Sequence, residues 1–186
     1  MRVQPVFGMH GQFGNQSKVT PEETRAQIEA LLERYGADGF QYAADRRAHR
    51  AAIAFRAHGR VVRLTVEMPD PEDPAFAITA AGRRRPRRRN ALNDPVMKAY
   101  EKVVRQRWRA LLLIVRAKLE AILCGITTFE AEFLANIVVA GGRTLGEHVV
   151  PQLEAACDSD AGDAAPLKLP TGESNAGGLR NREDAR

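Results

Sequence analysis

The chain has 186 residues, of which 44% are hydrophobic and 27% charged, a composition that excludes a wholly disordered or collagen-like protein. Its two cysteines exclude a disulfide scaffold and a multi-cysteine zinc module. The longest strongly apolar run, 110–115, is too short to span a membrane, and the first residues lack the apolar core of a signal peptide. These features predict a cytoplasmic protein.

The net charge of +5 is unevenly distributed along the chain. Residues 82–118 contain 13 arginines and lysines and only two acidic residues, a net charge of +11. The other 149 residues carry 15 basic and 21 acidic side chains, a net charge of −6. Such asymmetry indicates a polyanionic partner, with nucleic acid the first candidate. The alternative is a solvated arginine-rich linker without a specific partner.

Residues 1–18 are rich in glycine and poor in apolar residues, which predicts a flexible arm. They do not form a phosphate-binding loop, because they lack its Gly-Lys-Ser/Thr ending. A helix is predicted to follow. Thr20 is its N-cap, Glu23 completes a capping box and Gly36 ends it. One apolar face recurs at helical spacing and consists of Ile28, Leu31, Leu32 and Tyr35.

Three segments after this helix alternate with the period of two that is typical of strands. The residues that share a face are Phe40 with Tyr42, Ile53 with Phe55, and Val62 with Leu64 and Val66. Turns are expected at 45–47 and 58–59. Residues 19–68 therefore predict an α-β-β-β unit, in which the helix covers the apolar face of a three-stranded antiparallel meander.

A linker rich in proline and arginine is predicted over residues 69–93, because its prolines end the third strand and apolar residues are few. Asp94 and Pro95 then begin a helix of about 28 residues that continues to Gly125 and is basic in its first half. Its expected buried stripe consists of Val104, Trp108, Leu111, Leu112, Val115, Leu119, Ile122 and Leu123.

The helical unit, residues 94–157, is predicted to continue with two short helices. Thr127 is expected to cap the first, with Glu130 as its capping-box partner. Its expected inner face consists of Phe129, Phe133, Leu134 and Ile137. Thr144 and Glu147 repeat the capping box after a Gly141-Gly142 turn, and Pro151 is expected to kink or break the last helix. Residues 158–186 predict a disordered tail, so the fold class is α+β with disordered tails.

Groups that support catalysis do not converge in the sequence. The four histidines lack the spacing of a helical metal site, no Gly-x-Ser-x-Gly motif occurs, and Cys124 is expected to be a buried small hydrophobe. A magnesium site would need Glu120, Glu130 and Glu132 to meet on closely packed helices. We therefore predict no catalytic residue, no metal site and no cofactor.

The basic segment supplies the candidate binding residues. Lys102, Arg105, Arg109 and Arg116 are spaced three, four and seven apart, and are expected to align opposite the apolar stripe. Trp108 and Tyr100 would stack on bases if exposed, but Trp108 lies on that stripe, so binding is expected to be electrostatic. The predicted nucleic-acid-binding residues are Arg83, Arg84, Arg85, Arg87, Arg88, Arg89, Lys98, Lys102, Arg105, Arg109 and Arg116.

Residues 20–153 resemble a family of small bacteriophage and prophage proteins. The likeness lies in ERYGADGFQY, AAIAFRAHGRVVRLTVEMPDP and the segment from VRQRWRALLLIVRAKLEAIL to VVAGGRTLGE. Where the family has a Pro-Asp-Gly-Arg-Thr turn, this chain has 140–144 as AGGRT. The resemblance implies phage origin, a place in the host cytoplasm and a shared fold, and it implies no particular reaction.

These observations predict a phage-encoded, non-enzymatic accessory protein that binds DNA or RNA. One alternative is a protein-interaction module that inhibits or modulates a host complex, offering its sheet edge to a partner strand. Another is a structural phage component that oligomerises through the long helix. Membrane binding ranks lower, because the apolar face of the basic helix is needed for the core.

Overall fold

The computed structural model describes residues 18–79, 81–87 and 94–159; most of the predicted arm, Arg88, Arg89 and the tail from residue 160 lie outside these ranges. The chain divides into two compact units, residues 1–150 and 151–186. The α+β prediction is confirmed. The elements are α1 (Pro21–Tyr35), β1 (Gly39–Asp45), β2 (Arg50–Ala57), β3 (Arg60–Glu67), η1 (Pro74–Ala77), α2 (Pro95–Leu123), α3 (Phe129–Phe133), η3 (Leu134–Asn136) and α4 (Leu145–Ser159).

Helix α1 begins and ends as its sequence predicts. The Glu23 N–H donates to Thr20 Oγ1 at 3.1 Å, and the Thr20 N–H donates to the Glu23 carboxylate at 2.9 Å. Gly36 follows the helix with a φ of 95°, a conformation that residues with a Cβ rarely adopt. Both ends of α1 are therefore determined by neighbours in the sequence.

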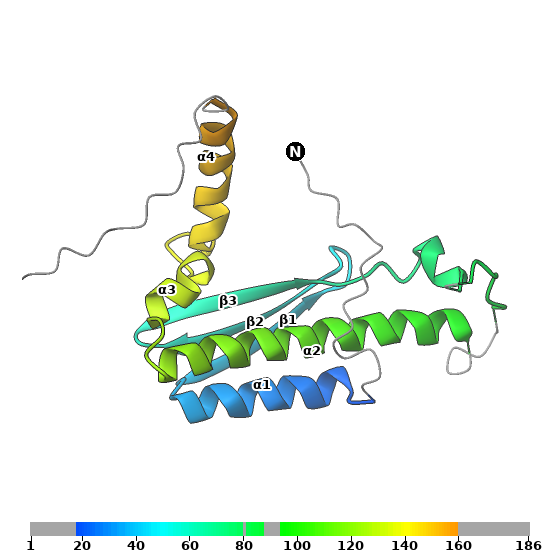
Figure 1. Ribbon diagram of the computed structural model, residues 1–186, viewed down its shortest axis with the longest axis horizontal. Coiled ribbons are helices and arrows are strands. Elements are labelled where there is room, and N and C mark those ends of the chain that lie inside the picture. The colour runs from blue at the N-terminus through cyan, green and yellow to red at the C-terminus, as the bar shows by residue number, and fades with distance from the viewer. Residues whose placement is uncertain (1–17, 80, 88–93, 160–186) are drawn as a thin grey trace, which may run out of the picture. The chain divides into compact units, whose positions relative to one another are not determined.

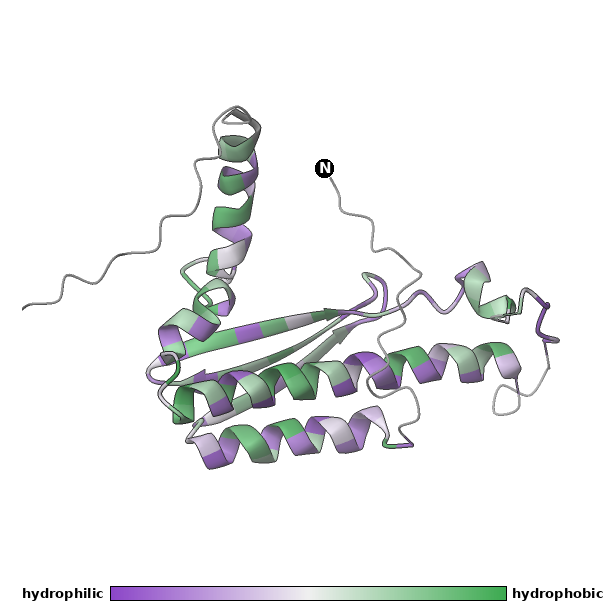
Figure 2. Cartoon of the chain, viewed as in Figure 1, coloured by the Kyte–Doolittle hydropathy of each residue, from purple (hydrophilic) through white to green (hydrophobic). Residues whose placement is uncertain are grey.

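The three strands form the predicted antiparallel meander in the order β1-β2-β3. Phe40 pairs with Phe55, and Ile53 pairs with Leu64, so the apolar residues of all three strands lie on one face. The turn between β2 and β3 has positive φ at both His58 and Gly59, the geometry that matches the twist of a two-residue hairpin. Hydrophilic and hydrophobic residues alternate along the strands (Figure 2).

One hydrophobic core joins this sheet to both long helices. α1 and α2 run side by side over the same face of the sheet (Figure 1). Leu32 of α1, Phe55 of β2 and Val62 of β3 are buried in one cluster with Trp108 and Val115 of α2. Residues 19–68 and the helical segment that follows thus share a single core, because α1 alone leaves part of the apolar face uncovered.

The segment between β3 and α2 is more ordered than the predicted exposed linker. Phe76 of η1 is buried, and its ring meets Tyr100 edge to face at a centroid distance of 5.8 Å. The Arg107 guanidinium donates to the carbonyl of Glu67, the last residue of β3. Upstream of Arg107, α2 therefore continues beyond the strand and packs on η1 (Figure 1).

Several predictions for the end of α2 and for α3 are wrong by one residue or one face. The N-cap of α3 is Thr128 rather than Thr127, because Thr128 Oγ1 accepts the Ala131 N–H at 3.2 Å. Leu123 and Leu134 are 69% and 52% exposed, and Cys124 is exposed as well. The expected burial of Leu123, Leu134 and Cys124 is therefore wrong.

Pro151 lies inside α4, so the predicted break of the last helix does not occur. Proline lacks the N–H that would bond the carbonyl four residues earlier, which belongs to Glu147. That carbonyl accepts instead from the Arg143 guanidinium at 2.6 Å. An arginine just before the helix thus replaces the missing donor, and the helix continues to Ser159.

The contrast between Phe133 and Leu134 provides a test of the core. Phe133 is fully buried against Phe55, whereas its neighbour Leu134 is half exposed. We expect Phe133→Ala to lower the free energy of unfolding by about 3–5 kcal/mol and Leu134→Ala to change it by less than about 1 kcal/mol. Urea denaturation followed by circular dichroism measures both; equal effects would contradict the packing described.

Glu147 connects the start of α4 to the sheet. Its carboxylate accepts the Thr144 N–H at 2.8 Å and the Arg63 guanidinium of β3 at 2.8 Å. The bond from the Thr144 N–H, together with the positive charges of Arg63 and Arg143, holds the pKa of Glu147 below its ordinary value. The capping box predicted for Thr144 and Glu147 is confirmed, and its ion pair with β3 is an addition that the sequence did not predict.

The lowered pKa of Glu147 gives this connection a defined pH dependence. Its stabilisation is complete above the ordinary glutamate pKa of about 4.3 and is lost as the pH falls through the lower folded pKa. The free energy of unfolding of wild type should therefore exceed that of Glu147→Gln at pH 7, and the difference should shrink below about pH 4. Glu29→Gln, an exposed change on α1, is the control. A difference independent of pH would argue against the connection.

Candidate nucleic-acid interface

Two lysines project from the part of α2 that extends beyond the sheet. Lys98 and Lys102 are exposed, and they lie one turn apart, about 6 Å along the helix axis. Neither ammonium has an ion pair or hydrogen bond within the described residues. The Asp94 side chain accepts the Val96 N–H at 3.0 Å and so begins the helix at a defined residue. The position of both lysines therefore follows from the helix register.

Three further arginines lie on a short turn that follows η1. Ile78 and Arg84 form an isolated bridge, and the Thr79 N–H donates to the Arg83 carbonyl at 2.8 Å. Arg83, Arg84 and Arg87 are exposed, and their guanidinium groups have no hydrogen bond or ion pair within the described chain. Within the predicted linker, residues 83–87 thus form a segment with its own backbone hydrogen bonds.

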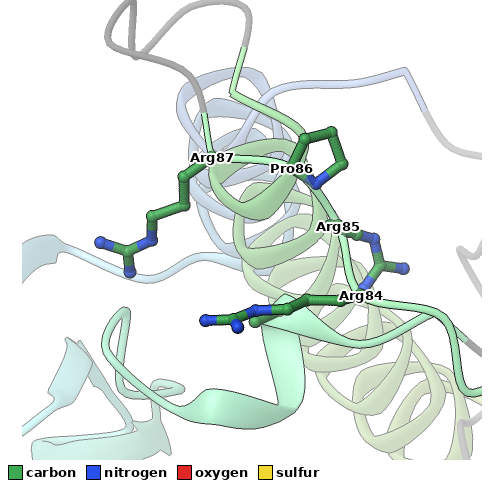
Figure 3. Close-up of a pocket in the computed structure, with 5 residues that line it drawn as sticks. Arg84, Arg85, Pro86 and Arg87 are labelled. Atoms are coloured by element: carbon green, nitrogen blue, oxygen red, sulfur yellow. The ribbon is translucent and has the colours of Figure 1, made fainter.

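A hollow of about 400 Å³ opens beside this turn and is lined by Ala77, Arg84, Arg85, Pro86 and Arg87. Figure 3 shows the Arg84 and Arg87 side chains extending to one side of the segment and Arg85 to the other. Two positive guanidinium groups therefore border the same space, next to a rigid proline ring. A group that fits there would be anionic.

Arg85 differs from its neighbours because its guanidinium is used inside the protein. One nitrogen donates to the Phe76 carbonyl at 2.9 Å and also to the Ile78 carbonyl. The Arg85 N–H donates to the Ala77 carbonyl as well. Arg85 thus holds the turn against η1, and it offers less to an external ligand than Arg84 or Arg87.

The basic residues of α2 that were predicted to align on one side of the helix are not all free, because α1 packs against α2. Arg109 donates to Gln27 of α1 at 2.7 Å, and Arg105 lies 3.8 Å from Glu101 with its Nε buried and unbonded. Arg109 therefore bonds α1 and Arg105 is half-buried, whereas the sequence predicted that both lie on the face opposite the apolar stripe. Arg116 is exposed, but it lies far along the helix from Lys98.

Other cations of the basic segment also serve the fold. Burial lowers the pKa of Arg107, against the opposing effect of Glu67, while its guanidinium holds the end of β3. Lys118 pairs with Glu132 of α3 at 3.0 Å. The net charge of the segment therefore overstates what is available to a partner.

Exposed acidic residues lie both on α1 and close to the free cations. α1 exposes Glu22, Glu23, Glu29 and Glu33, and the free cations on 83–87 and at the start of α2 lie away from α1 (Figure 1). The acidic residues exposed nearer those cations are Glu67, Asp70, Glu72 and Glu101.

Arg46 and Arg47 were not among the residues predicted to bind nucleic acid, although the structure places them near the free cations. Both are exposed in the turn between β1 and β2, and neither side chain has an ion pair in the described ranges. The Met68 N–H donates to the His49 carbonyl at 2.6 Å, so this turn lies at the end of the sheet where α2 extends onward. The Arg46-Arg47 pair is visible in the sequence, but only the fold brings it to the end of the sheet where α2 extends onward.

The alternative sites considered from the sequence have no support. Among the described residues no three histidine, cysteine or acidic side chains are placed to hold a metal ion. Glu132 pairs with Lys118 and Glu130 with Arg60, so the proposed carboxylate cluster with Glu120 does not form. In the described parts of the chain, no helix is long and apolar enough to cross a membrane.

Comparison with known proteins adds no relative. No family model, curated protein or solved structure matches the chain. The resemblance to phage proteins therefore stays a prediction.

Arg85 and Arg84 are a matched pair for testing the turn. Arg85→Ala removes the bonds to the Phe76 and Ile78 carbonyls, a loss of about 1 kcal/mol of local stability, whereas Arg84→Ala removes none. We expect chymotrypsin to cleave after Phe76 several-fold faster in Arg85→Ala than in wild type, and at the wild-type rate in Arg84→Ala. Equal rates in both variants would show that Arg85 does not hold this turn.

Proposed function

We propose that this chain is a phage-encoded, non-enzymatic accessory protein that binds nucleic acid through its basic end. The observation that carries the proposal is a set of exposed cations without partners in the described chain, on two segments that pack together. We call this set the basic end; it consists of Arg83, Arg84, Arg87, Lys98 and Lys102. The phage origin rests on the resemblance described above.

Rigid placement of these cations supports binding over a solvated linker. Phe76 is buried against Tyr100, and Arg85 ties the arginine turn back to Phe76, so the two segments are held together. Cations on ordered segments lose less conformational entropy on binding than cations on a flexible chain. A merely solvated linker would not need a buried aromatic anchor.

The mechanism would be neutralisation of phosphate charge. Each cation that meets a phosphate releases condensed counterions, so the affinity falls steeply with added salt. Phosphate contacts position a protein without reading sequence, and weak sequence selectivity is therefore expected. Arg46 and Arg47 extend the same end of the sheet and would contribute to longer sites.

A protein-interaction role is the second candidate, and a separate observation favours it. α2 and the turn after it expose large apolar residues, with Ile126 80% exposed. They are Leu113, Ile114, Leu123 and Ile126. Exposed apolar residues of this size are typical of a surface that another protein covers. Light scattering of the purified protein would detect self-association through it.

Binding to labelled nucleic acid across a salt series tests the first proposal. We expect micromolar binding to wild type at 50 mM salt, with a steep dependence of affinity on salt. Lys98→Ala/Lys102→Ala should weaken binding to all sequences alike and should reduce the slope of log K against log salt by about 2. Both changes favour helix formation, so α2 should remain folded.

The matched control is Arg34→Ala/Arg56→Ala, which removes the same charge. Arg34 lies in the last turn of α1, and Arg56 pairs with Asp38 near the start of β1, so both lie away from the basic end. The slope of log K against log salt for this control variant should stay close to that of wild type. An equal loss of slope in both variants would mean that net charge alone explains the effect. No binding of the wild-type protein at 50 mM salt would refute the proposal.

A further inference from the structure

We infer that the basic end takes double-stranded nucleic acid, held by backbone phosphates, in preference to a single strand. This inference rests on the proposed function and specifies its substrate class. Proteins that hold single strands stack the bases on exposed aromatic rings, each worth about 1–3 kcal/mol. The question is therefore where the aromatic rings of this chain lie.

Internal packing occupies the aromatic rings of the described residues. Tyr100, the ring nearest the basic end, packs edge to face on Phe76. Tyr35 stacks on Phe129, and Phe40 packs against the core. The buried rings are Phe55, Phe76, Trp108, Phe129 and Phe133.

Tyr42 is the most exposed ring in the described chain, at 42%, yet it is covered on one face. The Arg25 guanidinium lies 4.2 Å from the Tyr42 ring centroid and 5.6 Å from that of Trp108. A base would have to displace this cation–π contact to stack there. The open face of the sheet carries small and polar residues such as Gln41, Ala52, Ala54 and Thr65, and offers no ring either.

The hollow at the basic end is likewise suited to phosphate rather than to a base. Ala77, Arg84, Arg85, Pro86 and Arg87 line it, and the Arg84 and Arg87 side chains extend to the same side of the segment (Figure 3). Guanidinium groups match phosphate oxygens in charge and geometry. Lys98 and Lys102 add point charges one helical turn apart, near the arginine turn at residues 83–87.

Purely electrostatic binding favours the duplex over the single strand. Each phosphate contact contributes a slope of about 0.9 in log K against log salt on a duplex and about 0.7 on a single strand. For about five contacts the two slopes differ by about 1, so the ratio of duplex affinity to single-strand affinity rises about tenfold for each tenfold fall in salt. Starting from equal affinities at 1 M salt, where counterion release contributes little, the duplex should bind about tenfold more tightly at 0.1 M salt.

The test uses the full-length protein with four probes of one sequence: 20-nucleotide single strands and 20-base-pair duplexes, each as DNA and as RNA. We expect both duplexes, or one of them, to bind at least about tenfold more tightly than either single strand at 0.1 M salt. The DNA and RNA arms identify which duplex is preferred. The fluorescence of Trp108, the only tryptophan and a buried one, should not change on binding.

Two aromatic residues, Phe7 and Phe13, lie outside the described residues, so the variant Phe7→Ala/Phe13→Ala in the full chain is measured in parallel. Unchanged duplex preference in this variant supports the inference. Single-strand binding equal to or tighter than duplex binding overturns the inference but leaves the proposed function standing. Loss of binding to all four probes by the wild-type protein overturns the proposed function and the inference with it.

Discussion

The packing of two helices against one face of a small sheet is the interaction on which the rest of the structure depends. A three-stranded meander cannot bury its apolar face alone, and α1 covers only part of it. Trp108, Leu111, Val115 and Leu119 of α2 cover the remainder. Removal of α2 would expose the side chains around Phe55 and Val62 together, so the sheet and the basic helix are stable only as one unit.

The length of α2 determines where the free basic residues lie in the fold. At 29 residues it spans about 43 Å, longer than the eight-residue strands that it covers. The excess cannot rest on the sheet, and η1 supplies a small second core through Phe76 and Tyr100. This second core places the arginine turn beside the first turns of α2. Cations that are separate in the sequence are thereby gathered at one end of the fold.

Within the basic segment, the packing separates two kinds of cation. Arg85, Arg107, Arg109 and Lys118 each bond a carbonyl or side chain of another element and hold the fold together. The cations of the basic end have no such bond in the described chain. Charge counting in the sequence cannot distinguish these classes, because the partners of the first class are up to 82 positions away.

The sequence by itself determined the local features of the fold. Capping at Thr20, Asp94 and Thr144, the glycine end of α1 and the strand alternation all follow from contacts between near neighbours. The cap of α3 was predicted one residue too early, at Thr127 instead of Thr128, because the two neighbours have the same side chain.

Tertiary structure alone decided the exposure of Leu123, Leu134 and Cys124, the passage of α4 through Pro151 and the division of the arginines. The position of Arg46 and Arg47 at the same end of the sheet as the free cations was also decided by the tertiary structure. The physical reason is that burial, carbonyl acceptors and charge partners come from residues distant in the chain. Their positions are set only when the sheet and both helices have packed.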